Sequence, residues 1–271
     1  MVSAKPAVVE LTNVVKRYPG PRGCEPIMAV DHINFSMEDR EGGEFLALLG
    51  PSGCGKSTVL NMINGLVQPT EGEVRTFGHP VTGPNPDAVT VQQAYTCFPW
   101  LTVLGNVEFG LRIQGKPASE RRDIAESYLK RVGLADRLNA YPKELSGGMQ
   151  QRTAIARALA TRLPMILMDE PFGALDAQTR SDMQQMLLKL WSEEKNSIIF
   201  ITHDITEALV LADRILVFSP RLARIIHDFV VPFDRPRPAG LPLQDEFINL
   251  SQAILNLLKH QPAGGQVRVT V

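Results

Sequence analysis

Short apolar runs alternate with longer segments of helical periodicity along much of the chain. Near the start, residues Val8–Val14 and Ala29–Met37 are rich in β-forming residues, and Pro19–Gly23 between them is typical of a turn. The apolar run Glu44–Leu49 ends at a glycine, and Lys56–Leu66 then has a helical pattern. We therefore expect a β-rich beginning followed by a strand–loop–helix unit.

The central part of the chain, from residue 101 to 162, has a mainly helical pattern. Ser119 is the predicted N-cap of a helix at Arg121–Val132, and Ser146 of a helix that runs through Arg157. Strands and helices then alternate, at Met165–Met168, Gln178–Glu194, Ile198–Ile201, Ile205–Leu211 and Arg214–Phe218. Such alternation predicts a mostly parallel sheet covered on both faces, with the helical stretch inserted into it.

The last part of the chain begins with a proline-rich segment, Pro232–Pro242, which we expect to be extended. Six apolar residues then follow at helical spacing: Leu243, Phe247, Leu250, Ile254, Leu257 and Leu258. This spacing predicts a C-terminal helix. We expect it to pack on the rest of the protein, and a partner-binding helix is the alternative.

The composition is typical of a globular protein, with 44% hydrophobic and 21% charged residues among 271. A net charge of -1 argues against binding nucleic acid through a basic surface. No apolar run approaches the roughly 18 residues of a membrane span, and Met1–Pro6 has no apolar core typical of a secretory signal. The three cysteines are widely spaced and predict neither disulfides nor a zinc site. We expect a cytoplasmic protein.

A glycine-rich loop, Gly50-Pro51-Ser52-Gly53-Cys54-Gly55-Lys56-Ser57 followed by Thr58, lies between the predicted strand and helix. Its glycines let the backbone wrap closely around an anion, and the start of a helix presents N–H groups to phosphates. Lys56 can reach the β and γ phosphates, and the Ser57 hydroxyl can coordinate Mg²⁺. The loop predicts binding of Mg-ATP. Cys54 is either a small packing residue or a thiol activated by the helix start.

Two carboxylates, Asp169 and Glu170, end the predicted strand Ile166–Met168. Acids at the carboxyl end of a buried strand lie at the sheet edge where ligands bind. We expect Asp169 to hold the Mg²⁺ shell and Glu170 to orient and deprotonate the attacking water.

The segment Leu145-Ser146-Gly147-Gly148-Met149-Gln150-Gln151-Arg152 predicts a capped helix start whose first N–H groups are open to a phosphate. It resembles the signature motif of ABC-type ATPases. The resemblance implies a P-loop NTPase (RecA-like) core with a mostly parallel sheet, an N-terminal antiparallel β subdomain and an inserted helical subdomain. The implied ATPase domain spans residues 7–240 with its helical subdomain at about 95–160, and 241–271 form a tail.

Other motifs of the family occur in the expected order. Tyr18 matches the aromatic residue that stacks on adenine, and Gln93 the glutamine that links the metal and the attacking water to the helical subdomain, with Gln92 as a competing position. Ala174-Leu175-Asp176 resembles the loop that contacts the opposite nucleotide site. His203 matches the histidine that contacts the γ-phosphate, whereas His32, His79, His227 and His260 match nothing.

The resemblance also implies partners. In this family Ser146 and Gly148, with Gly147 between them, contact the γ-phosphate bound by another subunit, so a head-to-tail dimer with a second copy or a similar subunit is implied. The segment Phe98–Val107, together with Gly83–Asp87 and Phe233–Arg237, resembles ATPases of the nitrate, sulfonate and taurine importer group. Such subunits lie on the cytoplasmic face of the inner membrane and work with a transmembrane permease and a solute-binding protein. A soluble ABC ATPase outside transport is the alternative.

Overall fold

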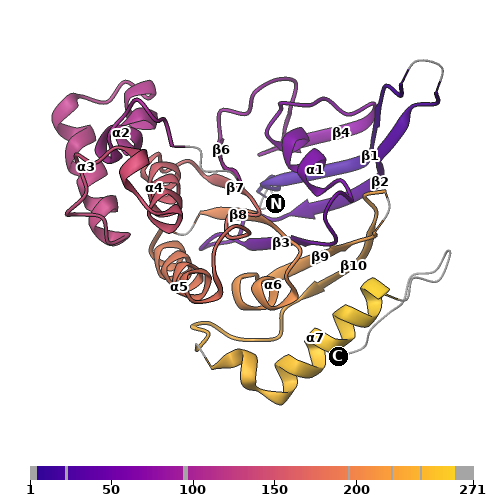
Figure 1. Cartoon of the computed structure of the whole chain (residues 1–271). Coiled ribbons are helices and arrows are strands. Elements are labelled where there is room, and N and C mark those ends of the chain that lie inside the picture. The colour runs from indigo at the N-terminus through magenta and orange to yellow at the C-terminus, as the bar shows by residue number, and fades with distance from the viewer. Residues whose placement is uncertain are drawn as a thin grey trace. The chain divides into compact units, whose positions relative to one another are not determined.

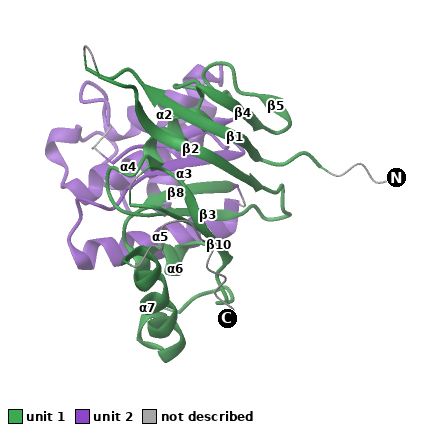
Figure 2. Ribbon diagram, turned by 90° about the vertical axis from the view of Figure 1, so that its right-hand side faces the viewer, with its two compact units in different colours: residues 1–86, 197–271 green, residues 87–196 purple. Residues whose placement is uncertain are grey.

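The computed structural model describes residues 5–21, 24–93, 97–194, 196–220, 222–238 and 240–259. Predictions that fall on Arg22 and Gly23, on the start of the helical subdomain near residue 95, and on residues 260–271 of the tail, with His260, lie outside the described residues. The chain forms two compact units (Figure 2): unit 1 comprises Met1–Pro86 and Ser197–Val271, and unit 2 comprises Asp87–Asn196.

Unit 1 contains an antiparallel sheet, as the β-rich beginning of the chain predicts. Its strands are β1 (Val9–Tyr18), β2 (Ile27–Met37), β4 (Glu71–Thr76) and β5 (His79–Pro80), in the order β2-β1-β4-β5. Leu11 pairs with Phe35 on one side and with Val74 on the other, and all three side chains are buried. The alternation of buried and exposed positions along β1 gives the sheet one apolar face.

A second set of strands in unit 1 carries the parallel core. Strand β3 (Phe45–Leu49) lies between β8 (Ser197–Thr202) and β9 (Arg214–Phe218) and is parallel to both, while β10 (Ile225–Val230) pairs with β9 in the antiparallel direction. All residues of β3 and β8 are buried, as expected for strands covered on both faces. Helices α1 (Lys56–Ile63) and α6 (Ile205–Leu211) pack against these strands (Figure 1).

The predicted C-terminal helix is present as α7 (Asp245–Lys259), preceded by the short helix η2 (Leu241–Leu243). It packs on α6 with Phe247 and Ile254 buried, which agrees with the packing interpretation. Leu243 does not belong to its apolar face: the residue ends η2 and is 82% exposed.

Unit 2 contains a parallel strand pair and most of the helices. Strand β6 (Ala88–Val91) runs beside β7 (Met165–Asp169), with Val91 opposite Met168. The helices are α2 (Val103–Ile113), α3 (Ala118–Arg131), η1 (Pro142–Glu144), α4 (Gly147–Ala160) and α5 (Ala177–Glu194). Helices α2, α3 and α4 pack on one another (Figure 1), as the helical pattern of residues 101–162 predicts.

The two predicted helix caps have different outcomes. Ser146 is the N-cap of α4, and its hydroxyl accepts a hydrogen bond from the N–H of Met149 at 3.3 Å. The prediction for Ser119 is wrong, because this residue lies inside α3, which begins at Ala118 and has Pro117 as its N-cap. The fixed φ of proline suits a helix start, and the carbonyl of Pro117 accepts from the N–H of Arg121 at 3.0 Å.

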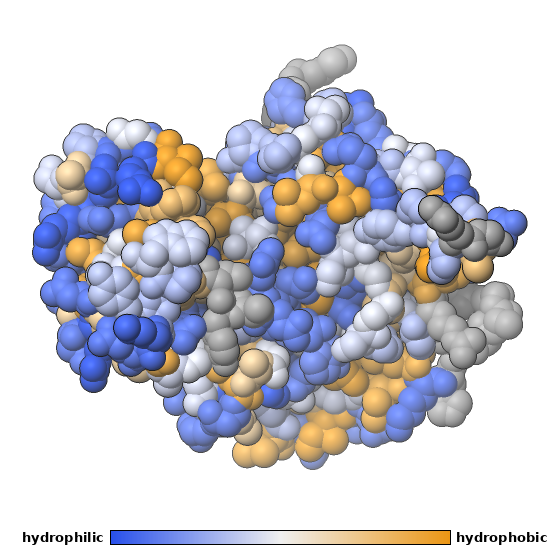
Figure 3. All heavy atoms as spheres, turned by 45° about the horizontal axis from the view of Figure 1, so that its top comes forward, coloured by the Kyte–Doolittle hydropathy of each residue, from blue (hydrophilic) through white to orange (hydrophobic). Residues whose placement is uncertain are grey.

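The surface carries both hydrophobic and hydrophilic residues. Hydrophobic residues are interspersed with hydrophilic ones on the face drawn in Figure 3. Among the helices that the structure describes, none combines the length and the apolar character needed to cross a membrane.

Candidate functional site

The glycine-rich loop joins β3 to α1 within unit 1. Gly53 and Gly55 have φ angles of 76° and 109°, which side-chain-bearing residues rarely adopt. A Cβ atom on Gly55 would lie 2.5 Å from the carbonyl oxygen of Ala29 and 2.9 Å from Cβ of Ala223. Glycine is therefore required both by the backbone turn and by close packing. Gly55 is also the N-cap of α1 and brings no capping side chain to the first N–H groups of the helix.

Lys56 lies inside this loop. Its side chain is 3% exposed, and its ammonium donates hydrogen bonds to the carbonyls of Gly50 at 2.7 Å and Pro51 at 2.8 Å. A buried cation beside a helix start gives the loop a positive character suited to phosphate groups. Ser52, Gly53 and Ser57 are exposed, whereas Cys54 is only 2% exposed. The burial of the Cys54 thiol favours its interpretation as a packing residue.

His203 follows the strand next to the loop. Since β3 and β8 are parallel, with Leu49 opposite Thr202, the loop and His203 start from the same edge of the sheet. The N–H of Gly50 donates to the carbonyl of Thr202 at 3.3 Å, so the two chain segments are joined at this edge. His203 itself is exposed.

Tyr18, the predicted adenine-stacking residue, ends β1 in unit 1. Its side chain is 36% exposed, and the ammonium of Lys16 lies 5.2 Å from the centre of its ring. An exposed ring of this kind is available for stacking on one face.

In unit 2, the ends of two parallel strands bring Gln93 and Glu170 together. Gln93 comes two residues after β6, and Glu170 comes directly after β7 with a φ angle of 43°. A Cβ atom added to Gly173 would lie 3.5 Å from Nε2 of Gln93 and 3.7 Å from Oε2 of Glu170. The two side chains therefore converge on Gly173, which favours Gln93 over Gln92 as the glutamine of this site. The left-handed backbone of Glu170 is unusual for a residue with a side chain and is a common feature of functional sites.

Asp169 is the last residue of β7 and is partly buried, so its carboxylate lies at the carboxyl end of the strand, as predicted.

The signature segment also lies in unit 2, at the start of α4. Cβ on Gly148 would lie 3.0 Å from Cγ2 of Thr179 on α5, so glycine permits a close approach of the two helix starts. The carboxylate of Asp176 accepts from the N–H of Thr179 at 3.0 Å, and hydrogen bonds from the Thr179 backbone and hydroxyl lower the pKa of Asp176. Ser146–Gly148 and the loop ending at Asp176 thus form neighbouring helix starts, each with exposed or partly exposed residues.

Asn106 was not identified from the sequence as a functional residue, yet it fixes an exposed aromatic loop. Its side chain is fully buried, its Oδ1 accepts from the N–H of Phe98 at 2.7 Å, and its Nδ2 donates to the carbonyls of Phe98, Leu101 and Thr102. Trp100, in this loop, is 69% exposed and stacks on Phe98. An asparagine at an otherwise apolar helix position was the signal available in the sequence.

Comparison with known proteins gives matches over most of the chain. The family model described as "ABC transporter" matches residues 30–173. The chain is 45% identical to the taurine import ATP-binding protein TauB of Chromobacterium violaceum, covering 92% of this chain and 95% of that protein. It is 44% identical to the nitrate import ATP-binding protein NrtD of Synechocystis sp., covering 93% and 95%.

Among solved structures, the chain is similar to the dimeric post-hydrolysis state of the ATP-binding cassette MJ0796 bound to ADP and Pi. The TM-score is 0.71 and the sequence identity 36%, and the match covers 83% of this chain and 100% of the solved one.

Proposed function

Because this chain belongs to the ABC transporter family of ATP-hydrolysing proteins, we propose that it is the ATP-binding subunit of an importer that takes up nitrate-, sulfonate- or taurine-like solutes through a separate permease. The observation that carries the proposal is the similarity, along nearly the whole chain, to ATP-binding proteins named for taurine and nitrate import. In this proposal residues 7–240 form the ATPase domain, with the helical subdomain at about 95–160. The subunit would act at the cytoplasmic face of the membrane.

The loop of residues 50–58 is proposed to hold the phosphates of ATP. Its support is the uncapped start of α1, the positive-φ glycines and the buried ammonium of Lys56. On nucleotide binding we expect Lys56 to exchange its bonds with Gly50 and Pro51 for bonds with phosphate oxygens. Tyr18 would stack on the adenine.

The residues proposed for Mg²⁺ are chemically suited to it. Ser57 and Gln93 offer neutral oxygens and Asp169 a carboxylate, and Mg²⁺ prefers oxygen ligands, with one or two carboxylates beside substrate phosphates. When bound, the ion would neutralise charge on the phosphates of ATP.

Glu170 is the proposed general base, which would hold and deprotonate the attacking water. Gln93 is proposed to orient that water, and the convergence of both side chains on Gly173 supports a shared role. His203 would contact the γ-phosphate from the sheet edge that also carries Gly50.

We further propose a head-to-tail dimer in which Ser146, Gly147 and Gly148 of one subunit complete the ATP site of the other. The support is the capped, glycine-rich start of α4 and the dimeric state named for the similar solved cassette. ATP would then favour the closed dimer, and hydrolysis would release it, so that nucleotide turnover shifts the permease between two conformations.

The exposed loop that contains Phe98 and Trp100 is proposed to bind the permease. A tryptophan that is 69% exposed and held in place by a stacked Phe98 and a buried Asn106 is typical of an interface anchor. The net charge of -1 argues against nucleic acid as a partner.

The proposal is tested by co-expressing the subunit with the permease and solute-binding protein encoded by neighbouring genes. We expect the permease to co-purify with the wild-type chain and with Leu243→Glu, which changes a residue that is 82% exposed in η2. We expect Trp100→Glu to lose the permease while the isolated subunit keeps its ATPase rate. If the wild-type chain hydrolyses ATP but binds no permease, the alternative of an ABC ATPase outside transport is favoured.

A further inference from the structure

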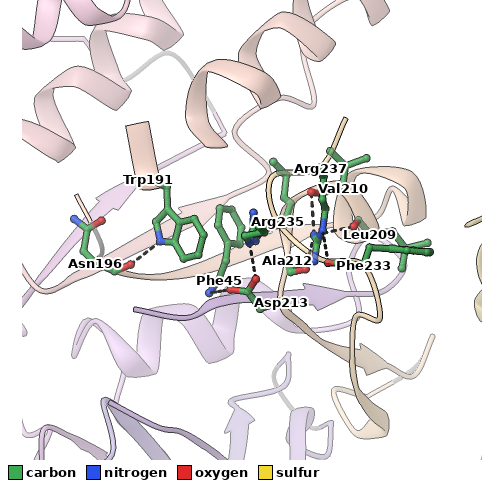
Figure 4. Close-up of polar contacts among 11 residues, drawn as sticks. Phe45, Trp191, Asn196, Leu209, Val210, Ala212, Asp213, Phe233, Arg235 and Arg237 are labelled. Carbon is green, nitrogen blue, oxygen red and sulfur yellow. Dashed lines mark hydrogen bonds and ion pairs between the residues drawn. The ribbon is translucent and has the colours of Figure 1, made fainter. Parts of the chain in front are cut away.

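Two arginines of the segment 233–237 occupy the C-terminal end of α6. The last carbonyl groups of a helix lack partners within it. In α6 the carbonyl of Ala208 accepts from the N–H of Ala212. The next four carbonyls, those of Leu209, Val210, Leu211 and Ala212, accept from Arg235 or Arg237 (Figure 4).

Arg237 makes most of these bonds. Its guanidinium donates to the carbonyls of Leu209, Val210 and Ala212 at 3.0, 3.0 and 2.7 Å, and its Nε donates to Phe233 in its own segment at 3.0 Å. The residue is 6% exposed, and burial lowers its pKa to about 10. Within the described part of the chain its hydrogen-bond partners are main-chain carbonyls. The three bonds to α6 all come from one nitrogen, Nη1, so a lysine ammonium can keep part of them. A lysine lacks the Nε–H that donates to the carbonyl of Phe233.

Arg235 ties the same helix end to the central strand. It donates to the carbonyl of Leu211 and, at 2.7 Å, to Oδ1 of Asp213, whose Oδ2 accepts from the N–H of Phe45 at 2.9 Å. Phe45 begins β3, the strand that leads into the phosphate loop. The segment 233–237 therefore fixes the end of α6 relative to this strand.

The opposite end of α6 begins at Ile205, two residues after His203. Asp204 is the N-cap: its Oδ1 accepts from the N–H of Glu207 at 3.1 Å, and its own N–H donates to the hydroxyl of Thr202 at 2.9 Å. The helix has seven residues, a length of about 10 Å. A helix this short moves as a unit, so a shift at its C-terminal end also displaces the turn that carries His203.

We infer that Arg237, assisted by Arg235, is a positioning residue for His203: the two guanidinium groups hold α6 at the setting in which His203 meets the γ-phosphate. The inference rests on the proposed contact between His203 and ATP. The segment 233–237 thereby takes part in hydrolysis from the far end of a helix, without touching the nucleotide.

The test compares Arg237→Gln and Arg237→Lys with the wild-type chain in steady-state ATP hydrolysis. We expect kcat to fall about 10- to 100-fold in Arg237→Gln, since displacement of a reacting group by about 1 Å has effects of this size. The loss should be smaller in Arg237→Lys, which keeps a cation at the end of α6. We expect KM for ATP to stay within about twofold, because the phosphate loop keeps its own contacts. Arg75→Gln, which removes an exposed arginine paired with Glu73 on β4, is the matched control and should retain the wild-type kcat.

A double-mutant cycle separates positioning from stability. In a His203→Ala background, Arg237→Gln should lower the remaining kcat by less than twofold, because the group it positions is gone. An equal fractional loss in both backgrounds, or a lower melting temperature with unchanged kcat, would overturn the inference. Should Arg237→Gln not fold, Arg235→Gln is carried through the same cycle.

The single variant His203→Ala distinguishes the two levels of the proposal. If it has the wild-type kcat, the proposed role of His203 is wrong and the inference fails with it. If His203→Ala loses activity while Arg237→Gln does not, only the inference is overturned.

Discussion

Glu170 has a left-handed backbone conformation, and its side chain lies at the site proposed for catalysis. Its φ angle of 43° directly after a buried strand turns the chain sharply, and the carbonyl of Glu170 accepts from the N–H of Gly173 at 3.1 Å. The turn brings Oε2 of Glu170 close to Gly173, the residue that Gln93 also approaches. The main chain thus fixes the position from which the proposed base acts.

Glu170→Gln should retain ATP binding and lose about 10²- to 10⁴-fold in turnover, because the amide cannot accept a proton from water. Size-exclusion chromatography with ATP should show an accumulated dimer. Glu120→Gln, which changes a carboxylate on the exposed side of α3, is the control and should behave as wild type. Unchanged turnover in Glu170→Gln would refute the assignment of the base.

Glu44 is a buried carboxylate that has no role in the proposed chemistry. Its side chain is fully buried just before β3, and neither carboxylate oxygen has a hydrogen-bond partner among the described residues. Nη2 of Arg40 lies 3.6 Å from Oε1. Burial raises the pKa of Glu44 above its ordinary value of 4.5, and Arg40 offsets only part of this effect. The ionised form is therefore unfavourable in the folded protein.

The stability of the protein should fall as the pH rises through the raised pKa of Glu44, since the destabilisation is absent below pH 4.5 and complete above the folded-state pKa. Glu44→Gln should remove this dependence and be about 1–3 kcal/mol more stable than wild type at pH 8, with the difference vanishing near pH 4.5. Urea unfolding at several pH values measures it, with the exposed Glu41→Gln as control. Parallel pH profiles of wild type and Glu44→Gln would contradict the prediction.

At the scale of elements, apolar periodicity identified those that are buried on a continuous face. Strands β3, β7, β8 and β9 and helices α1, α5 and α6 were predicted to within a few residues. The strands have nearly continuous apolar runs, and the helices have apolar residues at helical spacing. Strand β4 was missed because Glu71-Gly-Glu-Val-Arg-Thr has one fully apolar residue, and its strand conformation depends on pairing with β1. Strand β10 was missed because His227 and Asp228 divide its apolar residues into two short pairs, and its strand conformation depends on pairing with β9.

The candidate site was predictable to the extent that its residues lie in contiguous motifs. The phosphate loop, Asp169–Glu170 and Ser146–Gly148 could each be read from neighbouring residues. The hydrogen bonds of Asn106 and Arg237 could not be predicted, because they join residues to carbonyl groups at positions set only by the folded chain.

Helix α7 depends on a small apolar contact. Phe247 is 2% exposed and stacks on Phe233 with ring centres 5.7 Å apart. Phe247→Ala should lower the free energy of unfolding by about 3 kcal/mol, because a buried aromatic ring is lost. The neighbouring Ile248→Ala, at a position 52% exposed, should change it by no more than about 0.5 kcal/mol. Equal denaturation midpoints for the two variants would show that α7 adds little to the stability of unit 1.

At the scale of the whole molecule, the proposed site residues are divided between the two compact units. Tyr18, the phosphate loop and His203 belong to unit 1, whereas Gln93, Asp169, Glu170 and the signature segment belong to unit 2. Unit 1 is built from two separate stretches of chain, and unit 2 from one. Neither unit contains the full set of groups proposed for hydrolysis.

This division affects how the protein is made. Strand β3 leaves the ribosome early, but its two neighbours, β8 and β9, lie after residue 196. At the usual rate of translation, about 10–30 s pass before residue 218 has been added. During that time Phe45–Leu49, an entirely apolar strand, has no sheet partner. The phosphate loop, which follows this strand, is then not attached to a folded sheet. The nascent chain therefore carries an unpaired apolar strand, a segment prone to aggregation, until the residues of β8 and β9 have been added.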